Sequence, residues 1–142
     1  MLRFKKSVKR ALPLFAAILM IAFATGCGAP KLSAKFDEEA VKQKAQNVIA
    51  LLNAQDSEGI RELSAQALKD ALTDDTFAQI YAALGEGGAF VEVTGITAYG
   101  STNKNTGEEY AVTAAQAKYE KKSFTYTISF DTDMNLAGIY YK

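Results

Sequence analysis

A helical pattern of hydrophobic positions begins near Phe36. Apolar residues recur there every three or four positions, so they share one face of a helix expected over 37–55. These residues are Val41, Ala45, Val48, Ile49 and Leu52. Asp37 stands where it can cap this helix, because its carboxylate can accept hydrogen bonds from free backbone N–H groups. The apolar face is expected to pack on a core.

The same spacing continues beyond this first helix. A second helical segment starts after Asp56 or Ser57, with a possible break near 64–65. Thr73 and the two acidic residues after it begin a further helix, because acids favour the positive end of the helix dipole. Gly85 is expected just after the last turn of that helix. The pattern therefore predicts two to three helices.

After Gly88 the period of the pattern falls to two, which is typical of β-strands. Polar turns separate four strand candidates, at 90–100, 110–119, 123–130 and 136–142. Gly95 marks a bulge or bend in the first of them. Short turns between sequential strands predict an antiparallel meander. The predicted fold is α+β, with two to three N-terminal helices packed on a four-stranded antiparallel sheet.

The first 26 residues have the pattern of an export signal. A basic stretch precedes an apolar run over 11–23, which is shorter than the roughly 20 residues that cross a bilayer and suits a signal peptide. Ala24-Thr25-Gly26-Cys27 then resembles the lipobox of bacterial lipoproteins. The resemblance implies a diacylglyceryl thioether on Cys27 and cleavage before it. Ordinary secretion and an uncleaved N-terminal anchor are the alternatives.

Lipidation of Cys27 would set both the domain boundaries and the location. Residues 1–26 are then the lipoprotein signal peptide, 27–35 a tether, and 36–142 the α+β domain. Two acyl chains hold a protein stably at a bilayer, and the eight residues between Cys27 and Phe36 span at most about 25–30 Å when extended. The protein is therefore expected outside the cytoplasm, anchored by lipid and close to the cell membrane.

The sign of the net charge also changes at Cys27. Residues 1–26 contain five basic and no acidic residues, so the remainder has 11 Lys and Arg against 16 Asp and Glu. A domain with a net charge of about −5 is not expected to bind nucleic acid, because that binding depends on neutralising phosphates. The same charge argues against attachment to anionic lipid through basic side chains.

Candidate chemistry is sparse. The chain has no histidine, which excludes Ser-His and Cys-His nucleophiles and most zinc and iron sites. Residues 131–135 begin like a calcium loop, but Leu136 stands where glycine is needed and Lys142 where a glutamate is needed. A hairpin turn is the better interpretation. No catalytic residue, metal ligand or cofactor is predicted.

Three stretches resemble a known family. Residues 48–56 and 68–73 are similar to the helical opening of a small bacterial family catalogued as domain of unknown function 3887, and 130–141 to its last hairpin. The likeness covers about 36–142. The order of helices before a curved sheet also resembles the nuclear-transport-factor-2-like and cystatin-like folds. These resemblances imply the fold and transfer no catalytic residue.

Three functions are compatible with such a domain. A binding module would enclose a small apolar ligand or hold a partner protein, with candidate pocket residues Tyr81, Phe124, Tyr126, Ile128 and Tyr140, for which core packing is the alternative. An isomerase or dehydratase of the ketosteroid-isomerase type would need a pocket carboxylate. The acids cluster at helix starts and turns, and only Glu92 stands out in a strand. A structural cell-surface domain would dock a partner or form a homodimer through its sheet. The favoured prediction is a membrane-anchored lipoprotein that binds rather than transforms its ligand.

Overall fold

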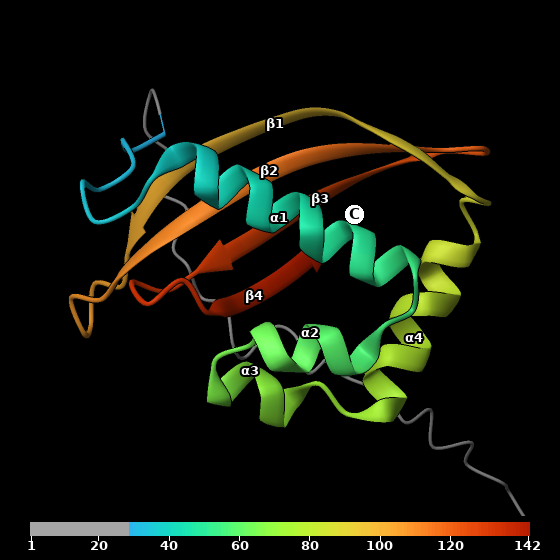
Figure 1. Cartoon of the computed structure of the whole chain (residues 1–142), viewed down its shortest axis with the longest axis horizontal. Helices are drawn as coiled ribbons and strands as arrows, with labels where there is room; N and C mark the ends of the chain where they lie inside the picture. The colour runs from blue at the N-terminus through green and yellow to red at the C-terminus, as the bar shows by residue number, and fades with distance from the viewer. Residues whose placement is uncertain (1–28) are drawn as a thin grey trace, which may run out of the picture.

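The computed structural model describes residues 29–142 as four helices followed by one antiparallel sheet (Figure 1). The helices are α1 (Glu38–Asn53), α2 (Ser57–Leu63), α3 (Gln66–Ala71) and α4 (Asp74–Gly85). The strands are β1 (Phe90–Thr102), β2 (Glu109–Tyr119), β3 (Ser123–Phe130) and β4 (Leu136–Tyr141), paired in the order β1-β2-β3-β4. The predicted α+β meander is confirmed. The expected signal peptide over 1–26 and Cys27 lie outside the described residues.

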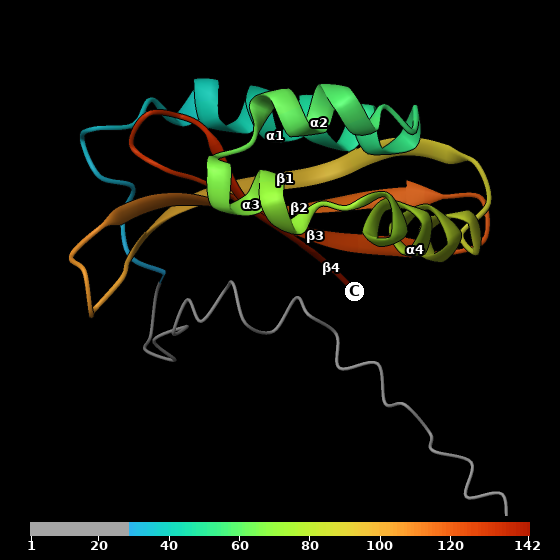
Figure 2. The same cartoon turned by 90° about the horizontal axis from the view of Figure 1, so that it is seen from below.

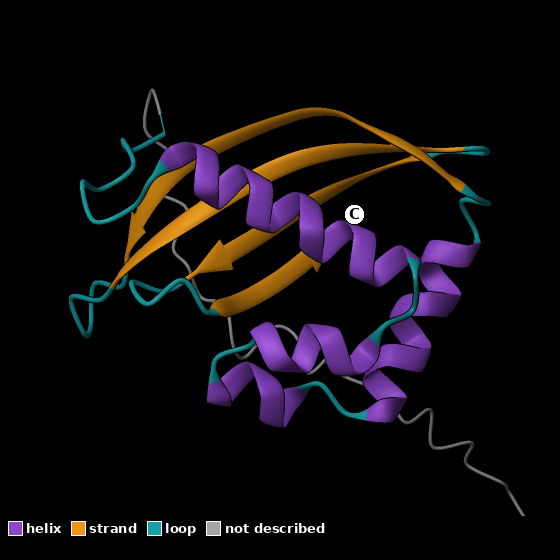
Figure 3. Cartoon of the chain, viewed as in Figure 1, coloured by secondary structure: helices purple, strands orange, loops and turns teal. Residues whose placement is uncertain are grey.

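The helices lie over one face of the sheet and around its β4 side. Seen from the side, α1 and α2 lie above the sheet (Figure 2). The β1–β2 hairpin projects from the end of the sheet opposite α4 (Figure 3). The domain therefore has two distinct ends, one formed by this hairpin and the other by α4 and the β2–β3 turn.

Local signals fix the helix starts, and one tertiary contact divides the second helical segment. Asp37 caps α1 by accepting a hydrogen bond from the backbone N–H of Ala40 at 2.8 Å. The backbone N–H of Ala65 donates to the carbonyl oxygen of Leu136 at 2.8 Å, so the chain leaves helical geometry there. This contact gives four helices in place of the expected two to three. Gly85 is the last residue of α4 rather than the residue after it.

The alternation in β3 places its large side chains against the helices, as predicted. The buried core combines the α1 stripe with residues of every other element except β1, whose Val93, Ile96 and Ala98 pack against it while partly buried. The largest core members include Tyr126, Phe77, Phe130, Ile49 and Leu52. The hydroxyl groups of Tyr119 and Tyr126 lie 2.5 Å apart inside this core. The hydrogen bond satisfies both phenols, since a buried hydroxyl without a partner is costly.

The sheet departs from regular pairing in β1, where the register shifts between Val93 and Gly95. The predicted bulge is thus present. The hairpin that joins β1 to β2 is longer than expected, because Thr102 pairs with Glu109 and only the six residues between them form the loop. Within residues 29–142, no helix is long and apolar enough to cross a membrane.

Candidate functional site

The five residues proposed to line a pocket do not converge. Phe124, Tyr126 and Ile128 are buried in the core between helices and sheet. Tyr140 pairs with Thr127 on the other face of the sheet and is 53% exposed. Tyr81 lines a cavity of about 250 Å³ next to β1, and its hydroxyl lies 2.8 Å from that of Ser57. Glu92, the carboxylate singled out in a strand, is exposed.

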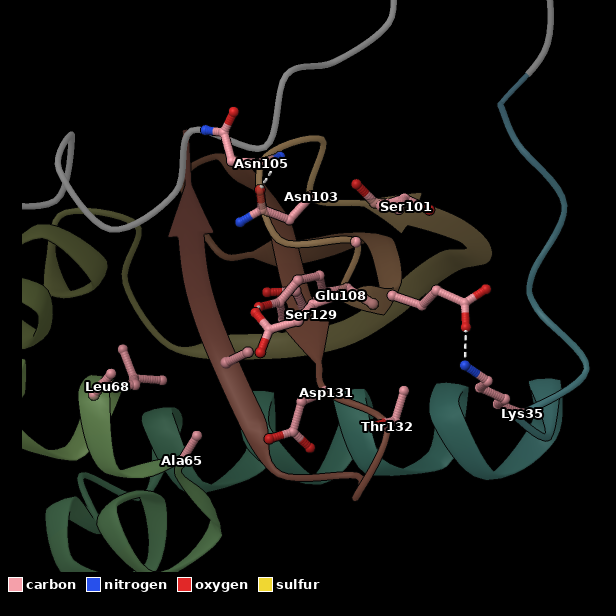
Figure 4. Close-up of a pocket in the computed structure, with 16 residues that line it drawn as sticks. Lys35, Ala65, Leu68, Ser101, Asn103, Asn105, Glu108, Ser129, Asp131 and Thr132 are labelled. Atoms are coloured by element: carbon pink, nitrogen blue, oxygen red, sulfur yellow. Dashed lines mark hydrogen bonds and ion pairs between the residues drawn. The ribbon is translucent and has the colours of Figure 1, made fainter.

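A larger cavity of about 610 Å³ lies at the hairpin end of the domain (Figure 4). Its walls come from the β1–β2 hairpin (101–110), the end of β3 with the following turn (129–132), the start of α3 (65–68), Lys35 and Ala137. We call it the hairpin groove. Its volume lies in the range of small-molecule sites, about 300–1,000 Å³. Figure 4 shows that polar side chains dominate the labelled walls.

Ser129 is the most unusual residue of the hairpin groove. It follows Ile128 in β3 and therefore lies on the opposite face of the strand from the core. Only 1% of its surface is exposed, and its Oγ has no hydrogen-bond partner among the described residues. Buried hydroxyl groups are normally hydrogen-bonded, so each exception calls for an explanation. A polar atom supplied by a ligand would satisfy this hydroxyl.

Tyr110 lines the same groove, and two carboxylates affect its pKa. Its hydroxyl donates to Oε2 of Glu108 at 2.8 Å. Burial raises the pKa of Tyr110, and the hydrogen bond to Glu108 and the negative charges of Glu108 and Asp131 raise it further. Both carboxylates therefore act on one phenol, although one belongs to the β1–β2 hairpin and the other follows β3.

The turns hold these acceptors in place. Oδ1 of Asp131 accepts hydrogen bonds from the backbone N–H groups of Asp133 at 3.0 Å and Asn135 at 2.8 Å. Oδ1 of Asn103 accepts similarly from the N–H of Asn105 at 2.9 Å. The two contacts of Asp131 confirm the predicted hairpin turn at 131–135. Among the described residues, no group of three or more acidic or cysteine side chains is placed to hold a metal ion.

The remaining charges of the groove are paired. Lys35 forms an ion pair with Glu109, and the hydrogen bond from Lys35 holds the pKa of that carboxyl below its ordinary value. Glu108 and Asp131 thus leave the groove with a net negative charge. Nearby negative charge with low-dielectric walls favours a positively charged group in the groove.

The family model described as "Protein of unknown function (DUF3887)" matches residues 45–139. The chain belongs to this family. The match includes the groove walls from α3, the β1–β2 hairpin and the end of β3, whereas Lys35 precedes it. The groove is therefore formed mainly by the part of the chain that defines the DUF3887 family.

A solved structure has the same fold as this DUF3887 domain. It is the NMR structure of a protein from Ruminococcus gnavus ATCC 29149, with a TM-score of 0.69 and 26% sequence identity. The alignment covers 81% of this chain and 99% of that protein. No curated protein matches the sequence.

Proposed function

We propose that this DUF3887 protein is an extracytoplasmic lipoprotein, anchored by lipid on Cys27, whose domain binds a small ligand in the hairpin groove. The observation that carries the binding role is the buried hydroxyl of Ser129, which has no hydrogen-bond partner within residues 29–142, in a groove of about 610 Å³. The lipobox-like sequence before Cys27 supports the anchor. We also propose that the fold is nuclear-transport-factor-2-like, and the order of helices before the sheet supports this resemblance.

The chemistry of the groove favours a ligand with a positively charged group. Glu108 and Asp131 are acceptors, and neither forms an ion pair in the described part of the chain. Hydrogen bonds from an ammonium or guanidinium group to such carboxylates are shorter and stronger than neutral ones. A neutral hydroxyl or amide on the same ligand would serve Ser129. A primary amine with a polar neighbour is the simplest ligand of this class.

Replacement of Cys27 by alanine tests the anchor. The wild-type protein, expressed as the full chain in a bacterium, is expected to begin at Cys27, to carry the mass of a diacylglyceryl group and to enter the detergent phase. Cys27→Ala is expected to lack that mass. Cys27→Ala combined with Ser33→Cys keeps one thiol in the chain and is expected to stay unmodified as well. An unmodified Cys27 on wild-type protein in the aqueous phase would show that the anchor is wrong.

Removal of the charges of Glu108 and Asp131 tests whether the ligand carries a positive charge. Titration of the full protein in detergent micelles with spermidine or argininamide, followed by two-dimensional NMR, is expected to shift the amide signals of Tyr110 and Ser129. Glu108→Gln with Asp131→Asn keeps the hydrogen-bond acceptors but removes both charges. The affinity is expected to fall at least about tenfold, equivalent to about 1.4 kcal/mol. Equal affinity in this variant would refute the charged-ligand proposal.

Matched controls separate the groove from the overall charge of the domain. Glu62→Gln with Glu92→Gln also removes two negative charges, but from exposed positions outside the groove, and is expected to leave affinity within about twofold.

Ser129→Ala is expected to change folding stability and ligand affinity in different ways. It removes a buried hydroxyl that has no partner in the described part of the chain, so folding stability is expected to stay level or to rise by about 1 kcal/mol while ligand affinity falls.

A further inference from the structure

The residues that lead into α1 are bonded to the hairpin end of the domain. The backbone N–H of Gly100 in β1 donates to the carbonyl oxygen of Pro30 at 2.9 Å. Leu32 packs against the core, and Phe36 is buried. We call residues 30–36 the N-terminal segment. Although the sequence suggested a tether over 27–35, most of that stretch is part of the folded domain.

Gly100 is needed for this contact. A Cβ atom at position 100 would lie far inside van der Waals contact with the carbonyl oxygen of Lys31. A glycine in a strand marks a site where another backbone approaches closely. The ion pair between Lys35 and Glu109, the first residue of β2, attaches the same segment at a second point. The N-terminal segment is thus held to both strands of the β1–β2 hairpin.

Covalent geometry limits how far Cys27 can lie from this attachment. Pro30 is three residues after Cys27, and three extended residues span at most about 11 Å. A free tether over 27–35 would have allowed more than twice that distance. The lipid on Cys27 therefore cannot be far from the hairpin end, whatever path residues 27–29 take.

We infer that the β1–β2 hairpin end of the domain faces the membrane surface, with the β2–β3 turn directed away from it. This orientation depends on the lipid anchor proposed above. Strand β2 has 11 residues, so the two ends of the sheet are roughly 35 Å apart at about 3.3 Å per residue. The domain behind the leader is acidic, so no excess of basic side chains draws its other faces onto anionic lipid. The hairpin groove then opens close to the headgroups.

Two matched lysine positions test the orientation. Lys104 lies at the tip of the β1–β2 hairpin and Lys121 in the β2–β3 turn, and both are exposed. Cys27 is the only cysteine of the chain and is consumed by the thioether, so Lys104→Cys or Lys121→Cys supplies the one free thiol. Each variant is labelled with a small fluorophore and reconstituted in phosphatidylethanolamine–phosphatidylglycerol vesicles that carry a headgroup quencher. Quenching is expected to be at least about threefold stronger at position 104.

Equal quenching at the two positions, or stronger quenching at position 121, would overturn the orientation. Gly100→Ala in the labelled proteins is expected to displace the N-terminal segment, lengthen the effective tether and reduce the difference between the positions. Gly95→Ala is the matched control, because its added Cβ would meet no atom of the described residues within 4 Å. Failure of the anchor itself is recognised separately, since the protein would then lack the lipid mass and would not float with vesicles.

Discussion

Replacement of Tyr126 by alanine is expected to lower the free energy of unfolding by about 4 kcal/mol. Large-to-small substitutions of buried aromatic residues cost about 3–5 kcal/mol, because packing contacts are lost and a cavity remains. Tyr126 has no exposed surface and packs near Tyr141, with ring centres 6.4 Å apart. Its loss also leaves the hydroxyl of Tyr119 without its partner. Urea unfolding followed by circular dichroism measures the change.

Tyr140→Ala is the matched control for this experiment. Tyr140 lies in β4 on the opposite face of the sheet and is 53% exposed. Its replacement is expected to cost less than about 1 kcal/mol, as is usual for a partly exposed site outside the core. A cost for Tyr126→Ala no larger than that for Tyr140→Ala would contradict the division of the sheet into a core face and an outer face. Tyr126 would then have to be reconsidered as a pocket residue.

The helices and strands could be predicted from the sequence because the signals for them are local. Asp37 and Thr73 each accept a hydrogen bond from the N–H three residues later, so a helix start can be recognised within four residues. The strict alternation in β3 likewise identifies its core face without knowledge of its neighbours. The break after α2 was harder to place, since it depends on a backbone contact with Leu136, more than seventy residues away in the sequence.

The hairpin groove could not be predicted in the same way. Its walls come from separate stretches that share no period, and they meet only because the β1–β2 hairpin and the β3–β4 turn lie at the same end of the sheet. The sequence identified Asp131 as a turn residue, and the structure confirms this role. Its proximity to Tyr110 depends on strand pairing. Ser129 was one of several polar residues on the outer face of β3, and nothing local distinguished the buried one.

The N-terminal segment had the composition of a linker, with proline, serine and lysine and without periodicity. Its attachment to Gly100 depends on backbone atoms, which a sequence pattern does not distinguish. The one available signal was the glycine at the expected end of the first strand. The reason for a glycine at this position becomes clear only from the structure, in which the carbonyl oxygen of Lys31 lies too close to Gly100 for a side chain.

Alkaline pH is expected to unfold the domain, whereas its free energy of unfolding is expected to stay constant across neutral pH. Because the chain has no histidine, no imidazole titrates between about pH 6 and 9. Burial strongly raises the pKa of Tyr126, and the hydrogen bond to Tyr119 raises it further. Burial also raises the pKa of Tyr99 and Tyr141. The folded state therefore keeps phenol protons that the unfolded chain loses above about pH 10.

The sign of this effect follows from proton linkage. Below about pH 10 both states hold the protons, and the stabilisation is fully present; above it the unfolded state binds fewer protons, so stability falls as pH rises. Tyr126 alone is expected to contribute a slope of about 1.4 kcal/mol per pH unit. Urea unfolding at pH 7, 9, 10.5 and 11.5 measures this slope. A stability that stays constant up to pH 11.5 would mean that Tyr126 is not buried as described.

Tyr126→Phe tests which phenol is responsible for the slope. At pH 7 this variant is expected to be about 1 kcal/mol less stable, since the hydrogen bond to Tyr119 is lost. Above pH 10 it is expected to lose stability less steeply than the wild type, so the two curves converge. Tyr140→Phe controls for removal of a phenol at the surface. Parallel curves for the wild type and Tyr126→Phe would assign the alkaline transition to other tyrosines. The lower stability at pH 7 reports the loss of a hydrogen bond, and the shallower slope above pH 10 reports the loss of a titrating group. A single measurement at neutral pH would not separate the two.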